Sequence, residues 1–168
     1  KKAGFDGLFD GQGHTVSGLY YKATDTNFLF GGLFGWTGQQ FPATIQNLKI
    51  TNFYVYGETV GALLGRSSKG LSVNNVYVSN GIVETQVTQA GALLGAVFGG
   101  PVAFQNCAVE NVKVQGNLYL GIFAGIANSQ DVEVTNCYVK NSSVKGVGQC
   151  GLVCGRMSGG NITVRNVY

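Results

Sequence analysis

A short motif, in which two glycines enclose three mostly apolar residues, recurs about every 30 residues along this chain. Its copies occupy residues 31–35, 61–65, 91–95, 121–125 and 151–155. A fixed repeat of this length is typical of solenoid proteins, in which each unit buries its apolar face only by stacking on its neighbours. The repeat therefore constrains the fold more than any other feature of the sequence.

A second motif lies between the glycine motifs and alternates apolar and polar residues around an asparagine. Its copies begin at Ile45, Val73, Phe104, Val134 and Val164, and each has asparagine at its third position. Alternation with a period of two, in stretches rich in Val, Ile, Tyr and Phe, predicts β-strands. Residues 16–21 fit the same frame, with Gly18 in the place of the asparagine.

The apolar alternation shifts by one residue at each asparagine, which predicts a bend there. Asparagine tolerates left-handed backbone angles better than most residues and therefore suits such a bend. We predict an all-β fold, a right-handed parallel β-helix (β-solenoid) of about 5.5 coils with about 30 residues per coil. A solenoid of five-residue repeats also matches the step from Asn47 to Asn52, but it leaves the glycine-rich third of each repeat unexplained.

Residues one repeat apart should lie one strand spacing, about 4.8 Å, apart. This register predicts three inward columns: Ile50, Val78, Val109 and Val139; Leu48, Val76, Cys107, Cys137 and Val167; and Leu63, Leu93, Phe123 and Val153. The asparagines should form one further column with a ladder of side-chain amides: Asn47, Asn75, Asn106 and Asn136. We expect residues 1–168 to be a single domain, with an atypical first coil or partial cap at 1–15 and repeats at 16–168.

The composition excludes several classes of protein. Apolar residues make up 45% of the chain and charged residues only 11%, which argues against disorder. A formal net charge of +3 gives no basic stripe, so we expect no nucleic-acid partner. The longest apolar stretch, residues 90–104, is broken by Gly99, Gly100 and Pro101, so we expect no membrane span.

The ends of the chain predict an excerpt of a longer protein. The chain opens at Lys1 without a signal peptide and closes on the strand-like Tyr168. The last half coil, residues 161–168, would present unpaired backbone groups that template further pairing. We expect Val164 to Tyr168 to meet either further chain or another copy in a head-to-tail filament.

The glycine segment repeated every 30 residues resembles the GLUG-motif repeat, and residues 5–19 resemble the first coil that commonly precedes it. The match spans almost the whole chain. GLUG repeats occur in large secreted or wall-attached bacterial proteins, including adhesin-like proteins and the non-catalytic region of some immunoglobulin-cleaving metalloproteases. The resemblance therefore implies a secreted or cell-surface location, and it supplies no catalytic residue.

The titratable side chains are few. His14, the only histidine, is either a general base or ligand near Asp6 and Asp10 or, as we favour, a turn residue. The carboxylates are Asp6, Asp10, Asp25, Glu58, Glu84, Glu110, Asp131 and Glu133. Carbohydrate-cleaving enzymes need grouped acids, whereas here the acids fall in different columns and Glu110 lies beside Lys140. We expect structural or solvated acids, and no catalytic residue, metal or cofactor.

Asp131 and Glu133 alternate outward on one strand and come nearest to a calcium site, but further ligands are lacking. The four cysteines allow two interpretations. Cys107 and Cys137 in one column, with Cys150 and Cys154 around a glycine motif, suggest two disulfides of an exported protein. The alternative, which we favour, is free and buried thiols, because parallel side chains in neighbouring coils leave the Cβ atoms rather far apart.

Tyrosines recur at one outward position of the repeat. Tyr77, Tyr138 and Tyr168 share a column with Lys49 and Ala108. Exposed aromatic rings on a flat sheet can bind a glycan or a protein, and equally they can stabilise the sheet by cross-strand stacking. Tyr77, Tyr138, Tyr168 and Lys49 are therefore the candidate binding face.

The functional hypothesis is a non-catalytic structural or adhesive module of a secreted or cell-surface protein, acting as a stiff spacer or a binding surface. The alternative is a fragment of a carbohydrate-active enzyme, a polysaccharide lyase or hydrolase on a β-helix. That alternative requires long loops around a cleft, and the regular repeat interval leaves little room for them. Ice binding requires a flat Thr-x-Thr array, and Thr24 and Thr26 form only one such pair.

Overall fold

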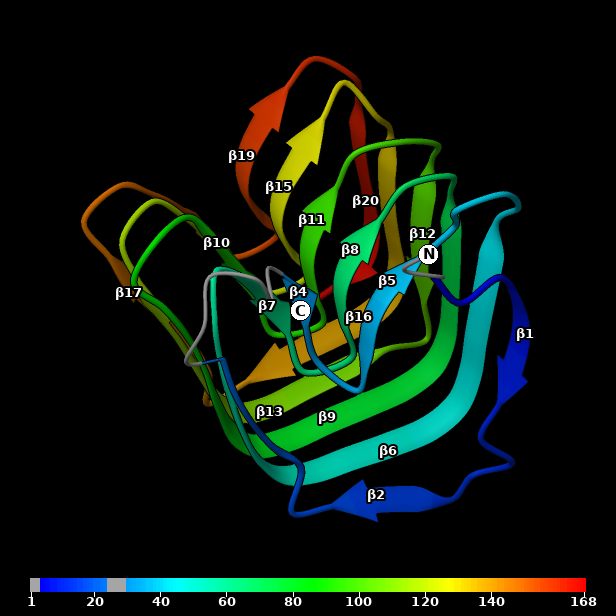
Figure 1. Cartoon of the computed structure of the whole chain (residues 1–168), viewed down its shortest axis with the longest axis horizontal. Helices are drawn as coiled ribbons and strands as arrows, with labels where there is room; N and C mark the ends of the chain where they lie inside the picture. Colours follow the sequence, from blue (N-terminus) through cyan, green and yellow to red (C-terminus); the bar gives the residue numbers. More distant parts are fainter. Residues whose placement is uncertain (1–3, 24–29) are drawn as a thin grey trace.

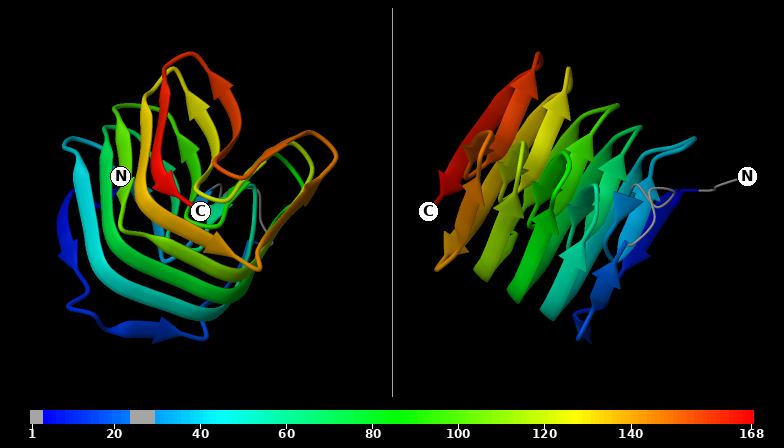
Figure 2. Two further views of the ribbon diagram at one scale, coloured as in Figure 1. Left: turned by 180° about the vertical axis from the view of Figure 1, so that it is seen from behind. Right: turned by 60° about the vertical axis from the view of Figure 1, so that its left-hand side comes forward.

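The computed structural model describes residues 4–23 and 30–168 of the chain. No residue in this part is helical, and parallel strands stack as a β-solenoid of about 5 turns, with coils about 30 residues apart (Figure 1). The coils follow one another in sequence order from one end of the stack to the other (Figure 2). The predicted all-β solenoid is confirmed. Asp25, Thr24 and Thr26 lie outside the described residues.

Each coil contributes strands to three parallel sheets. The long sheet contains β1 (Gly7–Asp10), β2 (Thr15–Ser17), β3 (Tyr20–Lys22), β6 (Ala43–Tyr56), β9 (Leu71–Thr85), β12 (Val102–Gln105), β13 (Ala108–Gly116), β16 (Val132–Lys140), β17 (Ser143–Gly146) and β20 (Ile162–Val167). The β7 sheet contains β4 (Phe30–Gly31), β7 (Thr59–Gly61), β10 (Gln89–Gly91), β14 (Tyr119–Gly121) and β18 (Gln149–Gly151). The β8 sheet contains β5 (Phe34–Thr37), β8 (Leu64–Ser67), β11 (Leu94–Val97), β15 (Ala124–Asn128) and β19 (Cys154–Ser158).

The long strands turn two corners, and an asparagine lies at each corner. Asn47 has a φ of 54° and Asn52 a φ of 55°, both in the left-handed region. The equivalent asparagines of the later coils have φ between 50° and 55°: Asn75, Asn80, Asn106, Asn111, Asn136, Asn141 and Asn166. β6 and β9 pair with each other on both sides of these corners (Figure 1). The prediction that asparagine makes the bends is confirmed.

Gly18 occupies a different bend from the one predicted. Ser17 pairs with Thr51, so Gly18 corresponds to Asn52 and not to Asn47. The predicted alignment of the first coil was wrong because β1 occupies the position before the first bend, where Phe9 pairs with Ile45. Gly18 has a φ of 77°, which a glycine adopts at no steric cost.

The predicted asparagine column is confirmed, but its amide ladder is interrupted. Asn75 donates its Nδ2 to Asn47 Oδ1 at 2.8 Å, and Asn166 donates to Asn136 Oδ1 at 3.0 Å. Asn106 donates instead to Asn74 Oδ1 at 2.9 Å. Among these coils only that of Asn75 has an asparagine, Asn74, directly before the bend, and the amide oxygen of Asn74 competes with that of Asn75.

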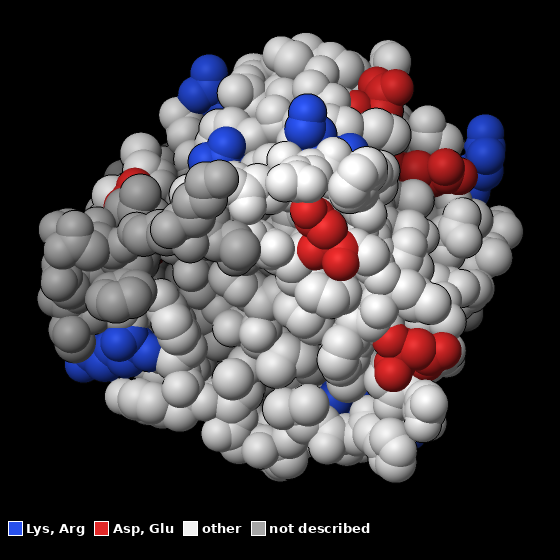
Figure 3. Space-filling model, turned by 45° about the vertical axis from the view of Figure 1, so that its right-hand side comes forward, with Lys and Arg blue, Asp and Glu red and all other residues white. Residues whose placement is uncertain are grey.

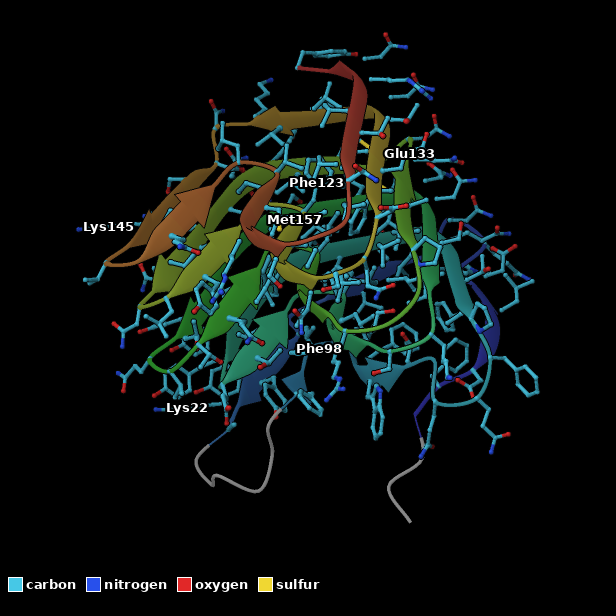
Figure 4. All side chains as sticks on the ribbon, turned by 90° about the horizontal axis from the view of Figure 1, so that it is seen from above. Lys22, Phe98, Phe123, Glu133, Lys145 and Met157 are labelled. Atoms are coloured by element: carbon cyan, nitrogen blue, oxygen red, sulfur yellow. The ribbon has the colours of Figure 1, made fainter. Side chains whose placement is uncertain are left out.

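The three inward columns are confirmed. Their residues in the middle coils are almost fully buried, and Phe123, at 1% exposure, packs on Phe104 with ring centroids 5.5 Å apart. The last members, Val139, Val153 and Val167, pack against the core while partly exposed. Phe123 and Met157 lie inside the stack, whereas Lys22, Glu133 and Lys145 lie on its outside (Figure 4).

The glycine motif is explained by the contact between the β7 and β8 sheets. A Cβ on Gly95 would lie 2.6 Å from Gly65 O and 2.7 Å from Val60 N. Its equivalents Gly65, Gly125 and Gly155 meet backbone atoms in the same way. The two sheets therefore touch through their backbones, and only glycine leaves room for that approach.

Candidate functional site

The outer face of the long sheet carries the predicted tyrosine column. Lys49 pairs with Tyr77, Tyr77 with Ala108, and Ala108 with Tyr138. Tyr168 continues the column, because its ring stacks on Tyr138 with centroids 6.3 Å apart and an interplanar angle of 11°. The structure thus brings the four candidate residues together on one surface, the tyrosine face, consisting of Lys49, Tyr77, Ala108, Tyr138 and Tyr168.

One carboxylate on the tyrosine face links two rings. Tyr77 donates its hydroxyl to Glu110 Oε2 at 2.6 Å, and Tyr138 donates to Glu110 Oε1 at 3.0 Å. These hydrogen bonds lower the pKa of Glu110 below its ordinary value. The hydrogen bond to Glu110 correspondingly raises the pKa of Tyr77. Glu110 therefore acts as an ionised acceptor that holds both rings.

The sequence predicted that Glu110 lies beside Lys140, but not that it binds the hydroxyls of two tyrosines. The register does pair Glu110 with Lys140, as expected. The available signal was that Glu110 lies two residues after Ala108 on the same outer face, flanked by tyrosines in both neighbouring coils.

Two shallow hollows flank Tyr138 on the tyrosine face. The first, of about 360 Å³, is lined by Lys49, Asn75, Val76, Tyr77, Asn106, Ala108 and Tyr138. The second, of about 420 Å³, is lined by Glu110, Tyr138, Val139, Lys140 and Tyr168. Both combine aromatic rings with hydrogen-bonding side chains.

A second aromatic patch, which the sequence analysis did not single out, lies at the first coils. Tyr20, 69% exposed, stacks on Tyr54 with centroids 5.6 Å apart. Tyr54 donates its hydroxyl to Glu84 Oε2 at 3.1 Å, and Lys22 Nζ lies 5.9 Å from the Tyr56 ring centroid. The same pairing of a tyrosine with a glutamate one coil away thus occurs twice on the long sheet.

A further hollow, of about 850 Å³, runs along the solenoid past the starts of β6, β9, β12, β16 and β20. Two acids line it, and both are engaged. Asp131 Oδ1 accepts hydrogen bonds from Asn161 N and Nδ2 at 2.8 and 3.2 Å. Glu133 accepts one from Thr135 at 3.1 Å and lies 3.6 Å from Arg165. On the side of the molecule drawn in Figure 3, charged side chains are few and scattered.

The acids near His14 stabilise loops. Asp10 accepts hydrogen bonds from Gln46 Nε2, Gln12 N and Asn47 Nδ2 at 2.8–3.0 Å, and these lower its pKa. Asp6 accepts from the backbone of Gln39 and Gln40. His14 is exposed, and its backbone pairs with Gly11 and Lys49. The histidine therefore lies in a turn, as favoured from the sequence.

The four cysteines are free thiols. Cys107 and Cys137 are buried, and the hydrogen bond to Cys137 and burial raise the pKa of Cys107 far above its ordinary value. Cys150 is exposed and Cys154 partly so, so the expectation of buried thiols was wrong for Cys150. The reason is that Cys150 lies in the last described coil, where no further strand packs on β18.

An arginine outside the tyrosine face is surrounded by aromatic rings. The Arg66 guanidinium lies 4.4 Å from the Phe98 ring centroid, 5.2 Å from Phe30 and 5.7 Å from Trp36. Its Nε and Trp36 Nε1 both donate to Ser68 Oγ. This cluster joins the β7 and β8 sheets in neighbouring coils.

Within residues 4–23 and 30–168 there is no group of three or more His, Cys, Asp or Glu side chains placed to hold a metal ion. The same residues contain no helix long and apolar enough to cross a membrane. Comparisons of the chain with models of protein families, with curated proteins and with solved structures found no match.

Proposed function

We propose that this chain is a non-catalytic repeat module of a secreted or cell-surface protein, in which a stiff solenoid displays the tyrosine face as a binding surface. The observation that carries the proposal is the pair of rings, Tyr77 and Tyr138, held by Glu110 at 2.6 and 3.0 Å. Tyrosine offers a large, rigid contact area at little cost in conformational entropy. Rings that are already fixed lose less entropy on binding, which favours affinity.

The rigidity of the scaffold supports this proposal. β13, which carries Ala108 and Glu110, is hydrogen-bonded to β9 on one side and to β16 and β17 on the other. The inward residues of the same strand, Val109, Val112 and Val114, are at most 1% exposed. A face built on paired strands over a packed core keeps its geometry when a ligand arrives. The resemblance to GLUG repeats of adhesin-like surface proteins agrees with such a role.

The alternative, a carbohydrate-active enzyme, gains less support. Glycoside hydrolases use two carboxyl groups roughly 5–10 Å apart, one of which has a raised pKa and acts as the general acid. Glu110 is the carboxylate of the tyrosine face, and its pKa is lowered. In the hollow of about 850 Å³, Asp131 is engaged with Asn161 and Glu133 with Arg165.

Binding and turnover assays on the same chain separate the two functions. The chain is immobilised and exposed to a mucin, to the same mucin after deglycosylation, and to neutral and acidic polysaccharides. We expect binding that Tyr138→Ala weakens roughly tenfold, and no release of reducing ends or unsaturated uronates. The matched control, Tyr20→Ala, removes an exposed tyrosine from the other patch and should bind as the parent does.

Either of two results would overturn the proposal. Failure of the chain to bind any of these probes would contradict the proposed binding surface. Release of sugar products by the parent chain, lost in Glu110→Gln, would favour the enzyme.

A further inference from the structure

The column of tyrosines on the tyrosine face has one gap, at Ala108. Tyr77 and Tyr138 lie in the coils on either side of Ala108, so two strand spacings, about 9.6 Å, separate their backbones. Ala108 is 7% exposed and forms the floor between the two rings. The hollow above it has a volume of about 360 Å³. Tyr138 and Tyr168, one spacing apart, stack directly and leave no such gap.

The width of this slot suits one inserted ring. Non-bonded carbon atoms make contact at about 3.5–4 Å, so a ring between two others needs about 7–8 Å between them. Between the backbones, a gap of two strand spacings exceeds that width. Glu110 binds both tyrosine hydroxyls and thereby holds the two walls at a fixed separation.

Polar groups surround the mouth of the slot. Lys49 offers an ammonium donor, and Asn75 and Asn106 line the same hollow. Both asparagines use their Nδ2 atoms within the amide ladder. Among the described side chains none donates to Asn75 Oδ1, because Asn106 donates to Asn74 instead, and none donates to Asn106 Oδ1. Lys49, Asn75 and Asn106 thus line the same hollow as the two tyrosine walls.

We propose that the slot between Tyr77 and Tyr138 binds one pyranose ring of a glycan; this inference rests on the proposed binding function. The C–H groups of a pyranose carry slight positive charge and match the negative faces of the two tyrosines. Its hydroxyl groups donate to the amide oxygens of Asn75 and Asn106 and accept from Lys49.

A peptide ligand fits this face less well. A peptide that adds a strand needs an open sheet edge, and β13 is already paired on both sides along the slot. A peptide side chain would need a deep apolar pocket as an anchor, whereas the floor here is the small Ala108.

Filling the slot tests the proposal. Ala108→Tyr completes the tyrosine column, and the matched control Ala108→Ser leaves the slot open. The probes are methyl pyranosides of glucose, galactose, mannose and N-acetylglucosamine, measured by saturation-transfer NMR and titration against the whole chain. We expect at least one pyranoside to bind the parent, Ala108→Tyr to weaken it roughly tenfold or more, and Ala108→Ser to change it by less than about twofold.

Tyr77→Ser, which removes one wall, guards against a folding defect in Ala108→Tyr and should weaken the same pyranoside by a similar factor. Pyranoside binding that survives both Ala108→Tyr and Tyr77→Ser overturns the slot. The slot is also overturned if a proline-rich or aromatic peptide binds the chain and no pyranoside does. If no pyranoside binds while Tyr138→Ala still weakens mucin binding, the slot is wrong and the binding module stands. If mucin does not bind either, both proposals fail.

Discussion

At the scale of single residues, the interior of the solenoid depends on close packing of large side chains. Phe123 is 1% exposed and packs on Phe104 from a neighbouring part of the coil. Phe123→Ala should lower the free energy of unfolding by about 3–5 kcal/mol, because it removes buried contacts and leaves a cavity. Urea unfolding followed by circular dichroism measures the change. Val147→Ala, at a position 89% exposed, is the control and should stay within about 0.5 kcal/mol. Equal effects of the two variants would place Phe123 in water.

The Glu110 carboxyl should titrate below its ordinary pKa of 4.5, since two tyrosine hydroxyls bind its ionised form. A folded-state pKa below the unfolded value means that this group contributes stability above about pH 4.5, which is lost as the pH falls through the folded-state pKa. Carboxyl ¹³C shifts recorded against pH measure the titration. Replacing both hydroxyls, in Tyr77→Phe with Tyr138→Phe, should raise the pKa. Tyr54→Phe, whose hydroxyl binds Glu84 instead, should leave it unchanged. An unaltered Glu110 titration in the double variant would contradict the hydrogen bonds.

At the scale of the strand and its bend, asparagine is preferred because it adopts left-handed angles and its amide binds the next coil. Asn111 has a φ of 52° and donates to Asn80 Oδ1 at 3.2 Å. Asn111→Ala should cost about 1–2 kcal/mol, because alanine lacks the short polar side chain whose local hydrogen bonds make the left-handed region accessible to asparagine. Asn111→Gly should cost less, because glycine adopts these angles freely. Thermal unfolding measures the stability of both variants. A glycine variant as unstable as the alanine variant would show that the loss of stability comes from the amide ladder alone and not from the backbone angles.

The glycine motif is the second element on which the coil depends. Gly95→Ala should destabilise the chain by about 1–3 kcal/mol, the usual cost of overpacking, because the backbone atoms of Gly65 and Val60 leave no room for a Cβ. Ser143→Ala on the exposed outer face serves as the control and should be nearly neutral. Denaturant midpoints compare the two. A neutral Gly95→Ala would mean that the β7 and β8 sheets lie further apart than described.

At the scale of the whole molecule, the stack of coils protects residues according to their position in it. Cys107 and Cys137 are buried, and a strand of the next coil covers each of them, whereas Cys150 is exposed on β18, on which no further strand packs. Iodoacetamide should label Cys150 in the native chain and reach Cys107 and Cys137 only with unfolding, because both of these thiols are buried and the reagent has no access to them. Mass spectrometry of peptides from native and urea-treated samples measures this order. Fast labelling of Cys107 in the native chain would show that the middle coils open.

Much of the whole-molecule arrangement was predictable from local chemistry repeated at a fixed interval. The columns headed by Leu48, Ile50 and Leu63 follow from one register, because each repeat must place its apolar residues over those of its neighbour. The bends at asparagine follow from the backbone preference of that residue. Gly18 was assigned to the wrong bend, because the first coil has an additional strand, β1, that departs from the repeat.

The candidate site, too, was only partly predictable from the sequence. The register alone places Lys49, Tyr77, Ala108, Tyr138 and Tyr168 in one column, so the sequence determined which residues share the tyrosine face. Only the tertiary structure decided that Glu110 binds the hydroxyls of Tyr77 and Tyr138, because those bonds depend on the direction in which side chains lean between coils. It also decided that Asn106 binds Asn74 and that Arg66 lies among three aromatic rings. Periodicity specifies the backbone register, whereas contacts between side chains depend on rotamers that the surrounding coils select.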